Sequence, residues 1–197
     1  MIIGISGKAQ VGKDTLGHAL IRRGKAFGVH IETRSFADKL KQMAITHFNL
    51  TRQQAYGTAE DKETVDSRWG LTPRTILQEI GQGYRKIYEN YWVDVVLNEL
   101  DSSKHYAITD TRYKNEHSGI VNAGGIVVRM ERPTELRGEV SNPNHSSEVD
   151  LDDSEFDLVF HNDGAIELVD SFADIIIEKY LTEGNQNGER HNSTKQN

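Results

Sequence analysis

The sequence predicts an α/β protein in which a parallel β-sheet carries helices on both faces. Short runs of β-type residues alternate with helical apolar patterns along the 197 residues, as in strands that are joined by crossover helices. The first apolar run, residues 2–5, leads directly into a glycine-bounded turn and then a helical pattern. These two observations together favour one domain over residues 1–182, followed by a polar tail over 183–197 that we expect to be disordered.

The expected strands cover residues 2–5, 31–36, 105–109, 126–130 and 158–160. Helical apolar spacing connects them at 16–27, 37–48, 76–87, 92–100, 116–123 and 169–180. Thr72 and Pro73 predict a helix start, because a threonine hydroxyl caps free N–H groups and proline suits the first turn. The polar segments 49–72 and 132–153 lack such a pattern, and we expect the chain to leave the sheet and its covering helices there.

Composition narrows the class of protein. A net charge of −7 argues against a broad nucleic-acid footprint, which needs many clustered cations, so small ligands are favoured over polymers. The chain has no cysteine, which excludes disulfides, thiolate metal sites and a cysteine nucleophile. No window approaches the length of a membrane span and no apolar leader precedes the first strand, so we expect a cytoplasmic protein without membrane partners.

The segment GKAQVGKDT at residues 7–15 predicts a phosphate-binding loop. Gly7 and Gly12 allow the backbone to curl around an anion, and the following helix directs its N-terminus at the same place. Lys13 supplies a mobile cation for phosphate oxygens. The usual pattern has Ser or Thr directly after the lysine, whereas this chain has Asp14 and then Thr15. A glycine-containing turn that binds nothing is the alternative interpretation.

A second candidate group follows the expected strand at 105–109. Asp110 would lie at the carboxyl end of a buried strand, where the ligands of open α/β sheets collect, and it could order Mg²⁺. Arg112 would direct paired donors at phosphate oxygens. Asp110 could instead cap the turn, and Arg112 could be solvated. We expect Lys13 and Asp110 to meet at one edge of the sheet.

Several motifs in order resemble phage deoxynucleoside monophosphate kinases over residues 1 to about 181. They are the loop at 7–15, Thr72-Pro73-Arg74 with Leu77-Gln78 and Gly81, Tyr91-Trp92, the ITDTR segment at 108–112 with Glu116, Arg132-Pro133, and DLV at 157–159 with NDG at 162–164. Phosphomevalonate kinases of animals share the loop ending in Gly-Lys-Asp and the Asp-Thr-Arg element, and they are the nearest rival family.

The resemblance implies a three-layer P-loop fold with a five-stranded parallel core, a substrate-binding segment at about 49–72 and a lid at about 132–153. It also makes Asp14 a family trait. ATP would bind at Gly7, Lys8, Gly12, Lys13, Asp14 and Thr15, with Asn162 and Gly164 near the adenine. Asp110 and Thr15 would hold Mg²⁺, while Lys13, Arg112 and Arg132 would act on the transferred group, Arg132 by closing over the phosphates.

On the acceptor side the candidates are Lys39, Arg74, Gln78, Trp92 and Glu116. Arg74 and Gln78 lie four residues apart, so one helix face could present both to a monophosphate, although a solvated face has the same spacing. Each of several others has a plainer alternative: Trp92 as a core residue, Arg132 as an exposed arginine, and Asn162-Asp163-Gly164 as a turn. His145 and Glu148 are expected in a solvated loop.

Three functions are compatible with these residues. The first is phosphoryl transfer from Mg-ATP to a deoxynucleoside monophosphate in nucleotide biosynthesis, in the host cytoplasm if the chain is phage-encoded. The second is another small-molecule kinase, such as one for phosphomevalonate. The third is a non-catalytic nucleotide switch, although the chain lacks an Asn-Lys-x-Asp element for guanine. The resemblance also makes a homodimer an expectation.

Overall fold

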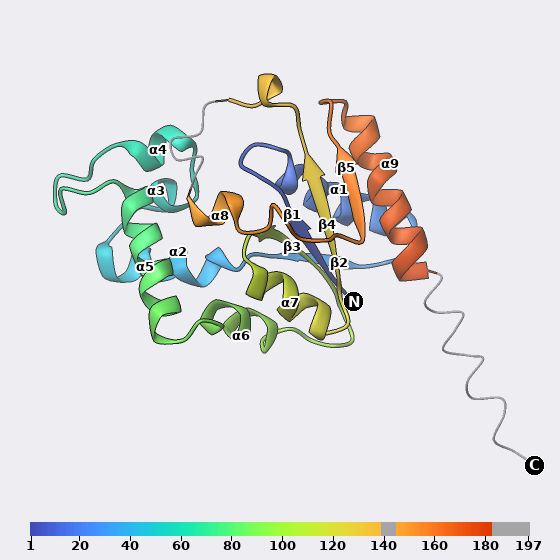
Figure 1. Cartoon of the computed structure of the whole chain (residues 1–197), viewed down its shortest axis with the longest axis horizontal. Coiled ribbons are helices and arrows are strands. Elements are labelled where there is room, and N and C mark those ends of the chain that lie inside the picture. Colours follow the sequence, from blue (N-terminus) through green and yellow to red (C-terminus); the bar gives the residue numbers. More distant parts are fainter. Residues whose placement is uncertain (139–144, 183–197) are drawn as a thin grey trace, which may run out of the picture. The chain divides into compact units, whose positions relative to one another are not determined.

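A parallel β-sheet forms the centre of the protein. The computed structural model describes residues 1–138 and 145–182, and within them five parallel strands pair in the order β2-β3-β1-β4-β5 (Figure 1). The strands are β1 (Ile2–Ser6), β2 (Ile31–Arg34), β3 (His105–Thr111), β4 (Ile126–Glu131) and β5 (Leu158–His161). The predicted parallel sheet is confirmed. β2 ends two residues earlier than expected because Phe36 already has helical backbone angles before α2.

Helices cover both faces of this sheet. Ile3 and Ile5 of β1 lie in one apolar cluster with residues of α1 (Lys13–Ala26) and α9 (Ile166–Ile177). Gly4 points to the opposite face, because successive strand residues alternate. There Ile120 of α7 (Lys114–Asn122) has its Cδ1 atom 2.6 Å from the position that a Cβ on Gly4 would take. Glycine at this position therefore lets α7 pack closely on the second face.

The chain divides into two compact units. The sheet unit contains residues 1–34 and the described residues from 100 to 182, and the helical unit contains residues 35–99. The helical unit consists of α2 (Ala37–Phe48), α3 (Arg52–Tyr56), α4 (Ala59–Glu63), α5 (Pro73–Ile87) and α6 (Tyr91–Leu97). Its core is built on Ala44, Leu50 and Ile76. The segment expected at 49–72 is thus part of a larger unit, in which it forms two short helices.

Local capping explains where these helices begin. The hydroxyl of Thr72 accepts a hydrogen bond from the backbone N–H of Thr75 at 3.1 Å, and Pro73 is the first residue of α5, as the sequence predicts. Thr51 and Thr58 form capping boxes at the starts of α3 and α4. The three threonines therefore divide a polar stretch into defined helices.

The remaining segments lie after β4 and after α9. A short 3₁₀ turn, η1 (Thr134–Leu136), follows β4, and α8 (Ser146–Val149) precedes β5. The expected lid at 132–153 therefore falls partly on residues 139–144, outside the described residues, as does the tail expected at 183–197. The last helix passes into a π-type turn, η2 (Glu178–Thr182). In the described part of the chain, no helix is long and apolar enough to cross a membrane.

Candidate active site

The loop between β1 and α1 has a backbone that few side chains would allow. Gly7 and Gly12 have φ angles of 145° and 102°, and Gln10 has a φ of 63°. A Cβ on Gly7 would lie 2.5 Å from the carbonyl oxygen of Met130 in β4, and one on Gly12 would lie 2.8 Å from the side-chain nitrogen of Asn162. The loop is therefore fitted tightly against the ends of two neighbouring segments, which fixes its curvature.

The side chain of Lys13 is hydrogen-bonded to the backbone of this loop. Its side-chain Nζ donates hydrogen bonds to the carbonyl oxygens of Gly7 and Lys8, both at 2.7 Å, and the residue is only 8% exposed. Because α1 begins at Lys13, the free N–H groups of its first turn face the same region. The side chains of Asp14 and Thr15 are exposed in that turn. The arrangement presents a cation and several N–H donors to a single anion.

Charged groups from several segments of the chain act on Lys13. Burial and the nearby guanidinium of Arg112 together lower the pKa of Lys13 to about 7, against the opposing effect of Glu148, Asp14 and Asp110. Asp110 and Arg112 come from the end of β3 and the turn before α7. The structure thus brings Lys13, Asp110 and Arg112 together at the carboxyl edge of the sheet, as the sequence predicts.

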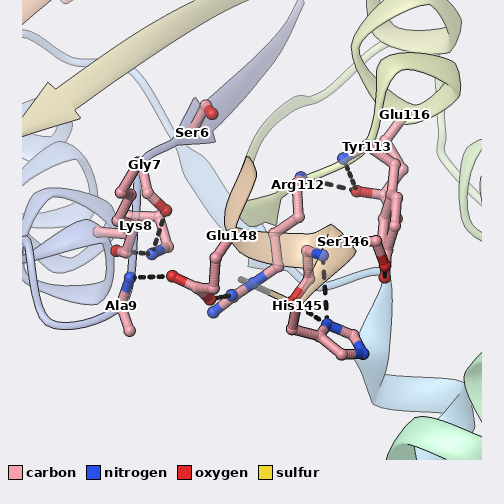
Figure 2. Close-up of polar contacts among 12 residues, drawn as sticks. Ser6, Gly7, Lys8, Ala9, Arg112, Tyr113, Glu116, His145, Ser146 and Glu148 are labelled. Carbon is pink, nitrogen blue, oxygen red and sulfur yellow. Dashed lines mark hydrogen bonds and ion pairs between the residues drawn. The ribbon is translucent and has the colours of Figure 1, made fainter. Parts of the chain in front are cut away.

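Glu116 fixes the turn that carries Arg112. Its carboxylate is 2% exposed and accepts hydrogen bonds from the backbone N–H groups of Arg112 and Tyr113, at 2.8 and 3.1 Å (Figure 2). The carboxylate therefore caps the N-terminus of α7. This corrects the expectation that Glu116 binds substrate, because a buried carboxylate with two backbone donors orients the turn instead.

Asn162 braces the loop between β1 and α1. Its side-chain nitrogen donates to the carbonyl oxygen of Val11 at 2.8 Å, and its side-chain oxygen accepts from the backbone N–H of Gly164 at 2.9 Å. The second bond confirms the turn that the Asn-Asp-Gly sequence predicts, while the adenine contact stays a prediction. Gly164 lies against Arg132, whose guanidinium Nη2 is 3.3 Å from the position of a Cβ there. Arg132 therefore adds a cation near the end of β5.

In the helical unit, the predicted acceptor residues are tied to neighbours. Lys39 pairs with Glu99 at 2.8 Å, and Arg74 forms an ion pair with Glu63. Gln78 is half-buried on α5, the helix that also carries Arg74. Trp92 is 2% exposed and donates its indole N–H to the carbonyl oxygen of Gly81 at 3.0 Å. Trp92 is therefore a core residue, which corrects its assignment to substrate binding, because a base has no exposed ring face to stack on.

Glu148 belongs to the site, although the sequence analysis places it in a solvated loop. Its side chain is only 9% exposed, and its Oε2 atom accepts a hydrogen bond from the backbone N–H of Ala9 at 2.7 Å (Figure 2). Its Oε1 atom forms an ion pair with Arg112. His145 caps the helix α8 that presents it, through a hydrogen bond from the N–H of Ser147. The solvated loop expected for His145 and Glu148 is wrong, because α8 directs the carboxylate into the loop.

The five-stranded parallel sheet and this loop give the protein the architecture of the P-loop class. The chain is 32% identical over 184 residues to a protein of Acanthamoeba polyphaga mimivirus named "Putative deoxynucleotide monophosphate kinase", covering 85% of this chain and 91% of the viral protein. With that identity over most of both chains, the protein belongs to the deoxynucleotide monophosphate kinase family. No model of a known protein family matches the chain.

Solved structures agree with the fold. Shikimate kinase from Aquifex aeolicus superposes with a TM-score of 0.50 at 14% identity, over 90% of this chain and 96% of that one. Shikimate kinase from Acinetobacter baumannii, in complex with shikimate, gives a TM-score of 0.50 at 18% identity, over 91% and 94%. At these identities the likeness concerns the arrangement of strands and helices alone.

Proposed function

We propose that the protein transfers the γ-phosphoryl group of ATP to a deoxynucleoside monophosphate and releases the two diphosphates. The observation that carries the proposal is that the loop N–H of Ala9, the guanidinium of Arg112 and the ammonium of Lys13 surround one anion position. The name of the viral relative supports the choice of acceptor.

Phosphoryl transfer needs alignment and charge dispersal more than covalent help. Lys13 would leave the carbonyl oxygens of Gly7 and Lys8 to bind the β and γ oxygens, and the N–H groups of the loop would hold the same phosphates. Arg112 would neutralise charge that develops on the transferred group, since its backbone is fixed by Glu116. Arg132 would supply a second guanidinium, from the end of β4.

Asp110 and Thr15 are the proposed protein contacts of Mg²⁺. Within the described residues, no cluster of three or more histidine, aspartate or glutamate side chains is arranged to hold a metal ion. A single carboxylate and a hydroxyl beside a polyphosphate fit Mg²⁺, because that ion takes most of its ligands from phosphate and water. Held by these residues, Mg²⁺ would supply positive charge that offsets the negative charge of the phosphates.

A coupled assay of ADP release tests the proposed reaction. Purified protein with Mg-ATP would be given a panel of deoxynucleoside monophosphates, ribonucleoside monophosphates and phosphomevalonate. We expect turnover that depends on a deoxynucleoside monophosphate. Turnover with phosphomevalonate alone would assign a different acceptor, and ATP binding without acceptor-dependent turnover would favour a nucleotide switch.

Arg74 is expected to act on the acceptor and to leave ATP binding unchanged. Its ion pair with Glu63 lies at a surface where 33% of the Arg74 side chain is exposed, so the pair contributes at most about 1 kcal/mol to folding. In Arg74→Ala, the KM for the monophosphate should rise on the order of tenfold or more, as for a lost charged hydrogen bond. Steady-state kinetics with each substrate varied would measure this.

Lys86→Ala is the matched control for Arg74→Ala, because Lys86 is an exposed cation on the same helix, α5. We expect its kinetic constants to equal those of the parent. If Arg74→Ala weakened ATP and monophosphate equally, a general defect of the helical unit would explain the result and the assignment of Arg74 would be wrong.

Nucleotide affinity should fall as the pH rises above 7. Burial and Arg112 hold the pKa of Lys13 at about 7 in the free protein, so the lysine loses its proton above that pH, while polyphosphate binds the protonated form. The affinity should therefore drop by up to about tenfold per pH unit above 7, where the phosphate itself is already fully ionised. Isothermal titration calorimetry with ADP between pH 7 and 9 would measure the slope.

Lys13→Arg provides the comparison for this pH dependence, because arginine keeps its charge throughout the range. If that variant binds ADP, its affinity should not change between pH 7 and 9. A constant affinity for the parent protein over the same range would show that Lys13 is still protonated at pH 9 and would contradict the prediction.

A further inference from the structure

We infer that the carboxylate of Glu148 takes the place of a phosphate group in the nucleotide-free protein, so that a nucleotide must displace it in order to bind. The inference rests on the proposed function only in its use of the loop as a phosphate site. It adds a competing ligand that the chain itself supplies.

The contacts of Glu148 are those that a phosphate would make. Its two carboxylate oxygens are divided between a backbone N–H of the loop, that of Ala9, and the guanidinium of Arg112 (Figure 2). The same carboxylate interacts electrostatically with Lys13. Backbone N–H groups, arginine and lysine are also the donors that bind phosphate in proteins. The side chain is nine-tenths buried, so these groups rather than water satisfy its charge.

The neighbouring acidic residues attach the same segment at other points. Asp150 accepts a hydrogen bond from the backbone N–H of Lys114 at 2.7 Å. Asp152 pairs with Lys8 at 2.9 Å and with Arg129 at 3.1 Å. Glu148 is the one among these three carboxylates that engages Arg112 and the N–H of Ala9. The segment thus has attachments of its own, and the exchange with phosphate concerns the Glu148 side chain.

A phosphate and this carboxylate exclude each other. Both are anions that need the same N–H and the same guanidinium, and two negative charges at hydrogen-bond distance from one donor set repel strongly in a buried site. The apparent affinity for nucleotide then equals the intrinsic affinity multiplied by the fraction of molecules in which Glu148 has left the loop. Removing the charge of Glu148 should raise that fraction.

The test compares Glu148→Gln with the parent protein and with Asp153→Asn. Glutamine keeps the size of the side chain and loses its charge. Asp153 is an exposed aspartate five residues along the chain, so Asp153→Asn makes the same change in net charge without touching the loop. Calorimetric titration with ADP, and with inorganic tripolyphosphate as a probe without base or sugar, gives the dissociation constants of all three proteins.

We expect Glu148→Gln to bind both probes on the order of tenfold more tightly than the parent, as when the competent fraction rises from about a tenth to nearly all. Asp153→Asn should stay within about twofold of the parent, as expected for an exposed charge in salt solution. A purely structural role of Glu148 would weaken binding or leave it unchanged, and either result would overturn the inference. Equal tightening in both variants would also overturn it, because net charge would then be the cause.

The outcome is separable from that of the proposed function. If the parent binds tripolyphosphate and Glu148→Gln binds it no better, the competition alone is refuted and the kinase assignment stands. If neither protein binds either probe, the loop is not a phosphate site and both proposals fail. Tighter binding by Glu148→Gln would support the competition even if the assay of ADP release identified a different acceptor.

Discussion

Lys13→Ala is expected to abolish most of the phosphoryl transfer. The ammonium of Lys13 is the buried cation of the loop, and the loss of one such preorganised charge removes on the order of 3 kcal/mol of transition-state stabilisation, or about two orders of magnitude in kcat/KM. The variant should remain folded, because the low pKa of Lys13 means that burial of its charge does not favour the folded state. Initial rates from the coupled assay would measure the loss.

The matched control is Lys25→Ala, since Lys25 is an exposed cation in the last turn of the same helix, α1. Its rates should equal those of the parent. Thermal unfolding of both variants would separate a folding defect from a catalytic one. Parent-like transfer by a folded Lys13→Ala protein would show that the loop is not the place where the reaction occurs.

Gly7→Ala should have the largest effect on the loop itself. A Cβ there would lie 2.5 Å from the carbonyl oxygen of Met130 and 2.7 Å from a side-chain carbon of Val11, at a φ of 145°. Neither a backbone carbonyl of the sheet nor the loop can move without loss of packing. We expect the free energy of unfolding to fall by about 3 kcal/mol, from backbone strain and overpacking together. Nucleotide binding should be lost with the shape of the loop.

Gly28→Ala separates the clash from the backbone strain. Gly28 also has a positive φ, 72°, but no heavy atom of the described residues lies within 4 Å of a Cβ there. That variant should lose only about 1 kcal/mol and keep its affinity for ADP. Chemical denaturation with ADP titration would compare the two. Equal losses in both variants would mean that the contact with Met130 has no energetic consequence.

Much of the fold follows from local patterns in the sequence. The strand, the glycine turn and the helix at residues 2–26 are encoded within a few residues of one another. Thr72 and Pro73 specify the start of α5 in the same local way. The proximity of Lys13 and Asp110 was predictable, because the carboxyl ends of parallel strands lie at one edge of a sheet and both residues are expected at such ends.

The roles of Trp92 and Glu148 depend on partners that are distant in the sequence. Trp92 could stack on a base or fill a core, and the choice depends on the position of Gly81 in another helix. Glu116 differs from these two residues, because it was assigned to substrate although it caps its own helix through local N–H groups, those of Arg112 and Tyr113. Glu148 was assigned to solvent because a glutamate in a polar segment has no apolar spacing, and its burial depends on a loop some 140 residues earlier in the chain. Sequence patterns do not report such contacts.

The hydrogen bond from Asn162 to the carbonyl oxygen of Val11 joins two residues that are 151 positions apart, so they are translated at well separated times. During synthesis the loop at residues 7–15 is made first. Asn162, which holds it, is added only after β5 has been translated. If this bond is needed for the proposed nucleotide binding, fragments that end before residue 162 should contain the loop sequence and fail to bind nucleotide.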